Sequence, residues 1–357
     1  MEIGIVGLPN SGKTTIFNAL TRGQAETTAY ASGKVEVHTA VVDVPDPRVD
    51  MLAELFKPKK ITYAQVTYND IAGLRAEKGT FSPQLLNIIS TNDALLHVVR
   101  CFHNPAVPHP LETVDPERDV QLLEEEFMLS DLAIIEGRLE RLAKQKGKGT
   151  PQEREHMAAE EALLQRLRDV LQEGKPLRAL DISPEEERLI RSYAFLSLKP
   201  QLIVFNIDDD GEDPSQELTP HWPKTMGLAL RGRLEMELVQ MSPEEAEEFM
   251  AMFGVEELGL SRVIRASYEL LGLISFFTVG EKEVRAWTIR KGSTALDAAE
   301  AIHSDLARGF IRAEVIHWDE LLRVGSLAEA RKQGLLRLEG KDYVVQDGDI
   351  VHIRFNV

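Results

Sequence analysis

The sequence predicts an α/β fold with a mainly parallel sheet, and two features support this prediction. Short apolar runs alternate with stretches of helical character over residues 1–100, and the alternation returns at residues 201–207 and near residues 226–230. A glycine-rich turn joins the first apolar run to the first helical stretch. Strands separated by helices lie parallel in one sheet, and the helices cover both of its faces.

The first block of this sheet is predicted to hold strands at residues 2–6, 61–68 and 94–99. Each of these runs is short and apolar, as expected of a buried strand. A helix is predicted over residues 14–20, directly after the glycine-rich turn.

The middle of the chain has a different character. From residue 115 to about residue 174, leucine and other apolar residues recur at helical spacing among many charged ones. The segment KGKGTP at residues 146–151 divides this stretch, which predicts an antiparallel hairpin of two amphipathic helices. The hairpin is either a solvated insertion or an arm for a partner, and Lys144, Lys146 and Lys148 give its tip a local positive charge.

The C-terminal segment is predicted to be a small α+β domain. A strand is expected at residues 283–289 and a helix at residues 294–306, and residues 342–346 and 350–355 flank an Asp-Gly-Asp turn typical of a β-hairpin. These changes of character predict three domains: residues 1–112 with 197–275, an inserted helical domain of residues 113–196, and residues 276–357.

Composition and charge restrict the function. The 357 residues carry a formal net charge of −17, which argues against a broadly basic surface for nucleic acid, so no DNA partner is expected. The single cysteine, Cys101, excludes an intramolecular disulfide and fits a reducing compartment. No apolar run approaches the length of a membrane span, and the N-terminus lacks the basic region of a signal peptide. We therefore expect a cytoplasmic protein.

The turn after the first predicted strand carries the phosphate-binding pattern Gly-x-x-x-x-Gly-Lys-Thr, written GLPNSGKT at residues 7–14. Its glycines allow the loop amides to turn inward, and the helix that follows points its positive end at the same place. Lys13 supplies a charge to the outer phosphates, and the Thr14 hydroxyl is a ligand for Mg²⁺. The pattern predicts a P-loop nucleoside triphosphatase. Its expected nucleotide-binding residues are Asn10, Ser11, Gly12, Lys13, Thr14 and Thr15.

A second phosphate and metal segment is predicted at residues 70–73, Asp-Ile-Ala-Gly, after the strand at residues 61–68. Asp70 is placed to hold Mg²⁺ through water, and the Gly73 amide is placed to contact the γ-phosphate and move when it leaves. Leu74 stands where many small GTPases have the glutamine that orients the attacking water. Because leucine cannot hydrogen-bond water, hydrolysis needs another group, an ion or a partner.

A base-reading segment is predicted at residues 206–209, Asn-Ile-Asp-Asp. It is similar to the Asn-Lys-x-Asp of GTPases, with Ile207 in place of the lysine. The Asp209 carboxylate offers two acceptors that suit the paired N–H donors of guanine, but acidic residues before Gly211 also fit a solvated turn. Asn206 and Asp209 are therefore the candidates for contact with the base.

Eight short stretches spread over nearly the whole chain follow one known pattern. They are GIVGLPN at 4–10, VPDPR at 44–48, DIAGL at 70–74, HVVRCF at 97–102, KEVRAWTI at 282–289, GFIRA at 309–313, EGKDY at 339–343 and FNV at 355–357. Together they resemble the Obg-like ATPases, also called the YchF family. The last four resemble that family's TGS domain, an ubiquitin-like α/β module shared with threonyl-tRNA synthetases and stringent-response enzymes.

The resemblance implies a Ras-like sheet with an inserted helical hairpin and a C-terminal TGS domain. It implies hydrolysis of ATP in preference to GTP, and association with the ribosome or its 50S subunit. By spacing, His109 matches the family's proposed catalytic histidine, although a loop histidine between Pro108 and Pro110 with no role fits equally. Asn10 matches a position that helps to hold K⁺ in related GTPases, so potassium joins Mg²⁺ as a candidate cation.

Several positions depart from the family pattern. Lys34 occupies the place of the switch threonine that coordinates Mg²⁺, and the candidates to replace that threonine are Thr27, Thr28, Ser32 and Thr39. Asp209 stands where a glutamate is usual, and Arg231-Gly232 stands where a small pair supports the base. Three functions therefore stay open: an ATP-hydrolysing switch on the ribosome, a GTP-specific GTPase, and a nucleotide-bound scaffold with little turnover.

Overall fold

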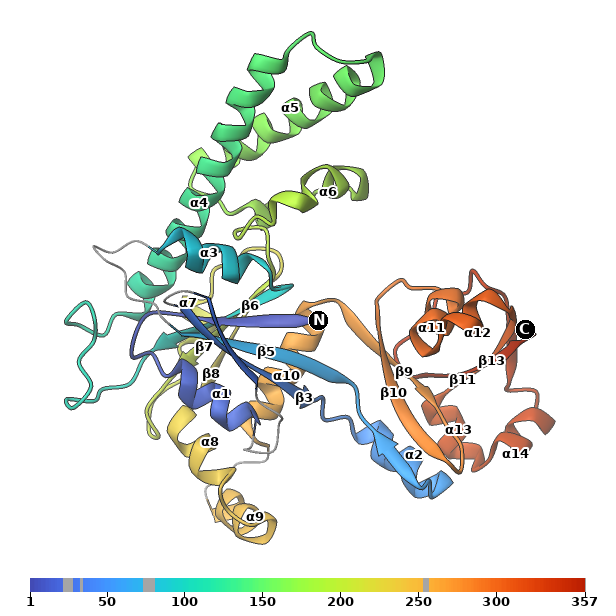
Figure 1. Cartoon of the computed structure of the whole chain (residues 1–357). Helices are drawn as coiled ribbons and strands as arrows, with labels where there is room; N and C mark the ends of the chain where they lie inside the picture. The colour runs from blue at the N-terminus through green and yellow to red at the C-terminus, as the bar shows by residue number, and fades with distance from the viewer. Residues whose placement is uncertain (22–27, 33–34, 73–80, 253–256, 357) are drawn as a thin grey trace. The chain divides into compact units, whose positions relative to one another are not determined.

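The structure is a computed structural model that describes residues 1–21, 28–32, 35–72, 81–252 and 257–356. Figure 1 labels its helices and strands along the chain. The chain forms two compact units, each with its own sheet. The first unit comprises Met1–Ala40 and Thr67–Val263, and the second comprises Val41–Val66 and Ile264–Val357.

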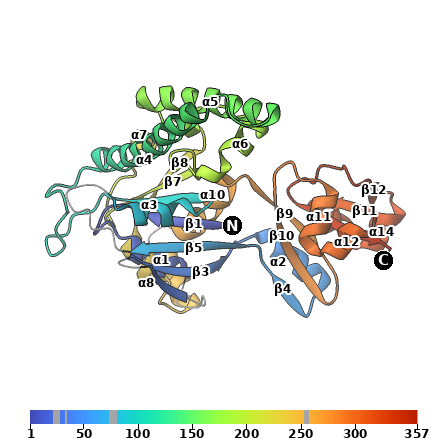
Figure 2. The ribbon, with the colours of Figure 1, turned by 45° about the horizontal axis from the view of Figure 1, so that its top comes forward.

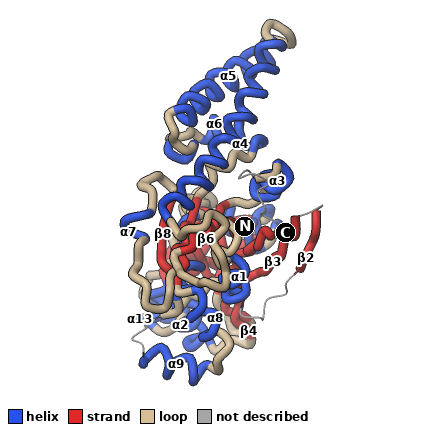
Figure 3. The backbone as a smooth tube through the Cα atoms, turned by 90° about the vertical axis from the view of Figure 1, so that its left-hand side faces the viewer, coloured by secondary structure: helices blue, strands red, loops and turns tan. Residues whose placement is uncertain are grey.

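The first unit is built on a seven-stranded sheet with the order β2-β3-β5-β1-β6-β7-β8. In this order, each pair of neighbouring strands from β5 to β8 is parallel. At one edge β2 pairs with β3 in antiparallel fashion, and both strands are labelled in Figure 3. The predicted mainly parallel sheet is therefore confirmed. Its strands are β1 (Glu2–Val6), β2 (Thr28–Ser32), β3 (Val35–Asp43), β5 (Gln65–Ala72), β6 (Ala94–Arg100), β7 (Gln201–Asn206) and β8 (Thr225–Leu230).

Helices cover both faces of this sheet (Figure 2). On one face, Leu85 and Ile89 of α3 and Phe127 of α4 pack with Val6 and Leu95 of the sheet. On the other face, α1 packs against α8. The strands β6 and β7 are buried along their whole length, as their continuous apolar sequence predicts. The helices outside the insertion are α1 (Lys13–Thr21), α3 (Pro83–Ser90), α7 (Ser215–Leu218), α8 (Gly232–Leu238), α9 (Pro243–Met252) and α10 (Gly259–Leu270).

The predicted helical hairpin is confirmed as α4 (Pro116–Gln145) and α5 (Pro151–Gln172), which run side by side in Figure 1. Each helix begins with a proline after a capping side chain, Asp115 for α4 and Thr150 for α5. A buried cluster that includes Ile135 and Leu164 holds the two helices together. The insertion continues through η2 (Leu177–Ala179), α6 (Pro184–Ile190) and η3 (Arg191–Tyr193).

The second unit contains a six-stranded sheet with the order β12-β11-β13-β9-β10-β4. One face of the sheet packs on α11 through a buried cluster that includes Phe276, Ala298 and Val315. Its strands are β4 (Lys60–Thr62), β9 (Leu273–Thr278), β10 (Glu283–Arg290), β11 (Phe310–His317), β12 (Arg337–Glu339) and β13 (Asp349–Phe355). Its helices are α2 (Pro47–Phe56), α11 (Ala295–Ile302), α12 (Ser304–Arg308), α13 (Trp318–Val324) and α14 (Leu327–Lys332).

The extent of the second unit differs from the domain predicted at residues 276–357. The unit begins at Ile264, and it also includes Val41–Val66. This early segment joins it because β4 pairs with β10 and because Arg48 forms an ion pair of 2.7 Å with Asp347. The inserted helices, predicted as a domain of residues 113–196, group with the first unit.

Three of the predicted elements are wrong in detail. Residues 61–68 are not one strand, because β4 pairs in the second sheet whereas β5 begins at Gln65 and pairs with β1. The predicted helix at residues 294–306 is divided into α11 and α12 by the extended backbone of His303. Residues 342–346 form no strand. The turn that follows them is hydrogen-bonded to Ser275 of β9, and β13 pairs with β9 and β11 instead of with residues 342–346.

None of the helices within the described ranges is long and apolar enough to cross a membrane.

Candidate functional site

The phosphate loop at residues 7–14 connects β1 to α1, as the sequence predicts. Gly7 and Gly12 have φ angles of 146° and 99°. A Cβ atom at Gly7 would lie 2.3 Å from the carbonyl oxygen of Val98, and one at Gly12 would lie 2.3 Å from the side-chain nitrogen of Asn206. Both positions therefore require glycine for backbone conformation and for space.

The Lys13 ammonium lies inside this loop. Its Nζ donates to the carbonyl oxygens of Gly7 at 3.0 Å and of Leu8 at 2.9 Å. Burial lowers the pKa of Lys13 to about 8, and the nearby Asp70 carboxylate opposes part of this effect. The ammonium is thus held where the outer phosphates of a bound nucleotide are expected.

Thr14 and Asp70 form the candidate metal site. The Thr14 hydroxyl donates to Asp70 Oδ2 at 3.0 Å, which joins the start of α1 to the end of β5. Burial raises the pKa of Asp70, although the Thr14 hydrogen bond opposes the shift. Asp70 Oδ1 is buried and has no hydrogen-bond partner within the described residues. A hydroxyl and a carboxylate oxygen are ligands that Mg²⁺ prefers, so this donor set fits the ion.

The described ranges contain no cluster of three or more histidine, cysteine, aspartate or glutamate side chains that could hold a metal. A magnesium ion bound at Thr14 and Asp70 would therefore need phosphate oxygens and waters to complete its coordination. This is the usual arrangement for Mg²⁺ at nucleotide sites. The hydroxyl oxygen of Ser11 in the same loop is also buried without a partner in the described chain.

Asn206 lies at the junction of three segments. Its Nδ2 donates to the carbonyl oxygen of Ser11 at 3.0 Å, and its Oδ1 accepts from the Gly232 amide at 3.1 Å. A Cβ atom at Gly232 would lie 2.7 Å from this oxygen. The side chain therefore joins the end of β7 to the phosphate loop and to the start of α8, and its second N–H remains for a ligand.

Asp209, the other candidate for contact with the base, and its neighbours differ in exposure. Asp209 is exposed in the turn after β7. Asp208 accepts from the backbone amide of His103 at 3.1 Å. The Nε atom of Arg231 is buried and makes no hydrogen bond to the part of the chain that the structure describes.

The segment between β6 and α4 lies against the phosphate loop. The side-chain amide of Asn10 donates to the carbonyl oxygen of Pro108 at 3.0 Å. Arg100, at the end of β6, donates to the carbonyl oxygen of Asn10 at 3.5 Å. The sequence places Asn10 in the loop, but nothing in its pattern reveals these two contacts.

His109, the predicted catalytic histidine, is buried beside the first turn of α4. Its side chain is 2% exposed, and its Nε2 lies 2.9 Å from Asp119 Oδ2. Its Nδ1 accepts a hydrogen bond from the Leu111 amide at 3.1 Å, so Nδ1 carries no hydrogen. The hydrogen is then on Nε2, which faces Asp119. Arg118 binds the other Asp119 oxygen at 2.8 Å. Since both ring nitrogens are occupied, His109 must leave this position before it can accept a proton from water.

Several predicted positions lie outside the described residues: Gly73, Leu74, Lys34 and Thr27. Thr28 and Ser32 belong to β2, and Thr15 is half-buried in the first turn of α1. The Thr39 hydroxyl donates to Asn69 at 2.7 Å. Because neighbouring residues of a strand point to opposite faces, Thr39 lies against the face of β5 opposite Asp70. It does not replace the switch threonine in this conformation.

A buried ion pair joins the inserted helices to the sheet of the first unit, and the sequence analysis does not identify it. Arg178 is 2% exposed, and its guanidinium donates to Glu124 of α4 at 2.9 Å, to Gln201 of β7 at 2.8 Å and to Thr225 of β8 at 2.9 Å. The available signal was an arginine between apolar residues in the segment PLRAL. It predicts burial, but it does not reveal the partner.

Fold and site together define the class of the chain. A mainly parallel sheet whose first strand leads through a lysine-containing phosphate loop into a helix is that of a P-loop nucleoside triphosphatase. Residues 2–135 match the model of a family described as 50S ribosome-binding GTPase. Residues 273–356 match the YchF-GTPase C-terminal model, which is described as a protein of unknown function. The chain belongs to the YchF family.

Its relatives match over their full length. It is 41% identical over 369 residues to the ribosome-binding ATPase YchF of Haemophilus influenzae, covering 100% of this chain and 99% of the relative. It is 40% identical over 371 residues to the protein of that name from Bacillus subtilis, covering 100% of both.

Two solved structures have the same fold. The YchF GTPase of Schizosaccharomyces pombe has a TM-score of 0.87 and 30% identity, and the match covers 99% of this chain and 97% of that one. A GTP-binding protein from Pyrococcus horikoshii has a TM-score of 0.59 and 21% identity, and the match covers 100% of both chains.

Proposed function

We propose that this protein is a Mg²⁺-dependent ATPase that acts as a switch on the ribosome. The observation that carries the proposal is the phosphate site itself, in which the Lys13 ammonium fills the loop and the Thr14–Asp70 pair stands beside it. The names of the curated relatives, ribosome-binding ATPases 40–41% identical over the whole chain, supply the nucleotide and the partner. Such a switch requires a cytoplasmic location.

Competition separates ATP from the alternative ligand GTP. The exposed Asp209 and the name of the solved S. pombe relative favour GTP, whereas the names of the curated relatives favour ATP. Labelled ATP bound in the presence of Mg²⁺ is displaced by unlabelled ATP or GTP in parallel titrations. We expect ATP to compete at lower concentration, and a clear preference for GTP would replace the proposal with a GTPase.

Single-turnover hydrolysis separates a switch from a scaffold with little turnover. We expect ATP cleavage that increases with ribosomes and that is lost in Lys13→Ala. Absence of turnover with bound ATP, with and without ribosomes, would favour the scaffold. Potassium is tested in the same assay by exchanging K⁺ for Na⁺. Asn10 is the candidate ligand for K⁺, because its contact with Pro108 uses the side-chain nitrogen and not the oxygen Oδ1.

Ribosome binding is tested by co-sedimentation of the full chain with 70S particles and with isolated 50S subunits. The C-terminal α+β unit, proposed as a TGS domain, and the tip of the α4–α5 hairpin are the candidate contact regions. A chain that remains in the supernatant with ATP, ADP and no nucleotide would contradict the proposed partner without affecting the proposed ATPase chemistry.

A further inference from the structure

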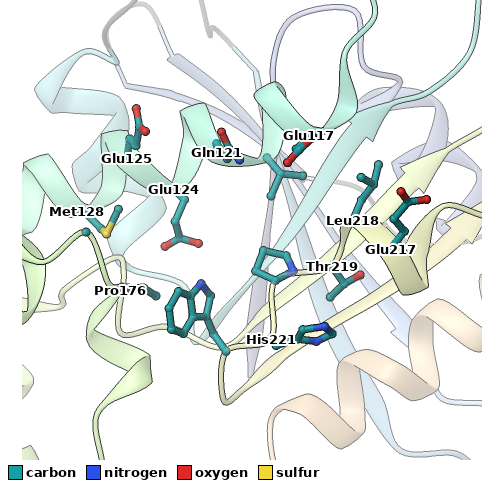
Figure 4. Close-up of a pocket in the computed structure, with 14 residues that line it drawn as sticks. Glu117, Gln121, Glu124, Glu125, Met128, Pro176, Glu217, Leu218, Thr219 and His221 are labelled. Carbon is teal, nitrogen blue, oxygen red and sulfur yellow. The ribbon is translucent and has the colours of Figure 1, made fainter.

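A cavity of about 410 Å³ lies in the first unit, away from the phosphate loop. It is lined by one face of α4, by the turn at residues 174–176, and by residues 217–222, which comprise the end of α7 and part of its connection to β8 (Figure 4). The α4 side chains recur at residues 117, 121, 124, 125 and 128, which is the spacing of a single helix face. Its size is in the range of about 300–1,000 Å³ typical of ligand sites.

The cavity combines apolar walls with acidic edges. Trp222, Met128, Leu218 and Pro176 supply apolar surface. Glu117, Glu125 and Glu217 also line the cavity, and Figure 4 shows their side chains at its exposed edge. No lysine or arginine is among the described residues that line it.

The three carboxylates are not neutralised by the described part of the chain. The fourth acidic residue at the cavity, Glu124, is buried against the Arg178 guanidinium and is therefore compensated. Glu117, Glu125 and Glu217 are exposed, and none of them has an ion-pair partner within the residues that the structure describes. The cavity thus has an excess of negative charge beside an aromatic ring.

We propose that this cavity binds an arginine side chain on a basic segment of a partner protein. The long alkyl stem of an arginine packs on apolar surface while its head group remains polar. Its planar guanidinium stacks on an indole ring and pairs with carboxylates through charge-assisted hydrogen bonds. Trp222 supplies the ring, and Glu117, Glu125 and Glu217 supply the carboxylates.

The same charges disfavour a nucleic acid at this place. Phosphate backbones are bound through lysine and arginine, and the part of the lining that the structure describes has neither. Neutralising the three glutamates would remove the attraction for an arginine, but it would not weaken the binding of a phosphate chain. The proposal does not depend on the proposed ATPase function, because the cavity shares no residue with the phosphate loop.

The test uses the full-length chain and a fluorescent, end-capped peptide of sequence Arg-Gly-Leu-Arg-Gly-Leu-Arg, with binding followed by anisotropy. The test variant is Glu117→Gln/Glu125→Gln/Glu217→Gln. We expect the peptide to bind the unmodified chain and to bind the variant about tenfold more weakly. A peptide with glutamate in place of arginine is expected not to bind.

A second triple variant controls for the change in net charge. Glu136→Gln/Glu140→Gln/Glu155→Gln removes three exposed carboxylates from α4 and α5 away from the cavity, and we expect it to bind the peptide like the unmodified chain. ATP binding and circular dichroism of both variants report whether the fold is retained. Equal affinity in the two triple variants would overturn the proposal, as would displacement of the peptide by a ten-nucleotide oligouridine.

Discussion

The side-chain amide of Asn206 donates a hydrogen bond of 3.0 Å to the carbonyl oxygen of Ser11, so the end of β7 is joined to the phosphate loop. The same side chain accepts from the Gly232 amide at the start of α8. A single residue therefore fixes the relative positions of the phosphate loop and of the two segments proposed to contact the base. This arrangement suggests that base contact and phosphate contact are mechanically linked.

Replacing Asn206 by alanine is expected to lower both stability and affinity. The change leaves the Ser11 carbonyl and the Gly232 amide without partners, and each lost hydrogen bond of a buried group costs about 1–3 kcal/mol. Urea denaturation measures the stability and nucleotide titration the affinity. Asp209→Ala is the matched variant, because the Asp209 carboxylate is exposed and is proposed to contact the base. Unchanged stability in Asn206→Ala would contradict the structural role.

Nucleotide affinity is expected to fall as the pH rises above about 8. Below that pH Lys13 carries the ammonium that binds phosphate, and above it burial favours the neutral amine, whose pKa is about 8 in the free protein. Binding then requires proton uptake, so affinity decreases by about tenfold per pH unit until the pKa of the bound state is reached. Calorimetric ATP titrations across this range provide the test.

The matched variant for this pH experiment is Lys13→Arg, because a guanidinium keeps its charge throughout the range. Its affinity is expected to be lower but independent of pH. A pH slope that persists in Lys13→Arg would assign the effect to another group.

Asp70→Asn is expected to remove the benefit of Mg²⁺ for ATP binding. The amide oxygen can still accept from the Thr14 hydroxyl, and burial raises the pKa of the Asp70 carboxyl, so we expect the variant to remain folded. ATP affinity is measured with Mg²⁺ and with EDTA. We expect the two values to converge in Asp70→Asn and to stay apart in Asp169→Asn, an exposed control on α5. A preserved magnesium effect in Asp70→Asn would exclude this carboxylate from the metal site.

His109→Ala is expected to slow single-turnover hydrolysis by about 10²–10⁴-fold at unchanged ATP affinity, if the histidine acts as a general base. His103→Ala removes an exposed histidine from the same segment and is expected to keep the rate. Asp119→Asn weakens the contact that holds His109 in its buried position. We therefore expect this variant to keep the rate of hydrolysis. Equal losses of rate and of melting temperature in His109→Ala and Asp119→Asn would instead give the pair a structural role.

Arg178→Met is expected to destabilise the first unit by about 3–5 kcal/mol, because it leaves the Glu124 carboxylate buried without its counter-ion. Adding Glu124→Leu removes that charge, and we expect the double variant to recover part of the loss. Thermal and urea unfolding measure both effects. A double variant that is no more stable than Arg178→Met would show that the contacts to Gln201 and Thr225 dominate.

The phosphate loop and the α4–α5 hairpin were predictable because their determinants are local. The glycines, Lys13 and Thr14 lie within eight consecutive residues between one strand and one helix. The hairpin is specified by helical periodicity and by Asp115 and Thr150 at its helix starts. Neither feature needs information about distant parts of the chain.

The errors have the opposite origin. An Asp-Gly-Asp turn favours a hairpin, but Asp347 and Gly348 form hydrogen bonds with Ser275 of β9. A local pattern cannot predict this contact, because Asp347 and Ser275 are 72 residues apart. The split at residues 61–68 has the same cause, since β4 is recruited by β10 of the second sheet. Pairing between distant strands is decided by the packing of a whole sheet.

The sequence by itself determined that this chain has a triphosphate-binding loop, because the glycines and the lysine of that loop lie within eight consecutive residues. It also determined the family, because each family stretch is a short run of consecutive residues. Only the tertiary structure decided which groups meet around that loop. It brought Asn206 to Ser11, placed His109 against Asp119, and buried Arg178 beside Glu124. These contacts depend on burial and on hydrogen-bond partners supplied by distant elements, and a linear pattern specifies neither.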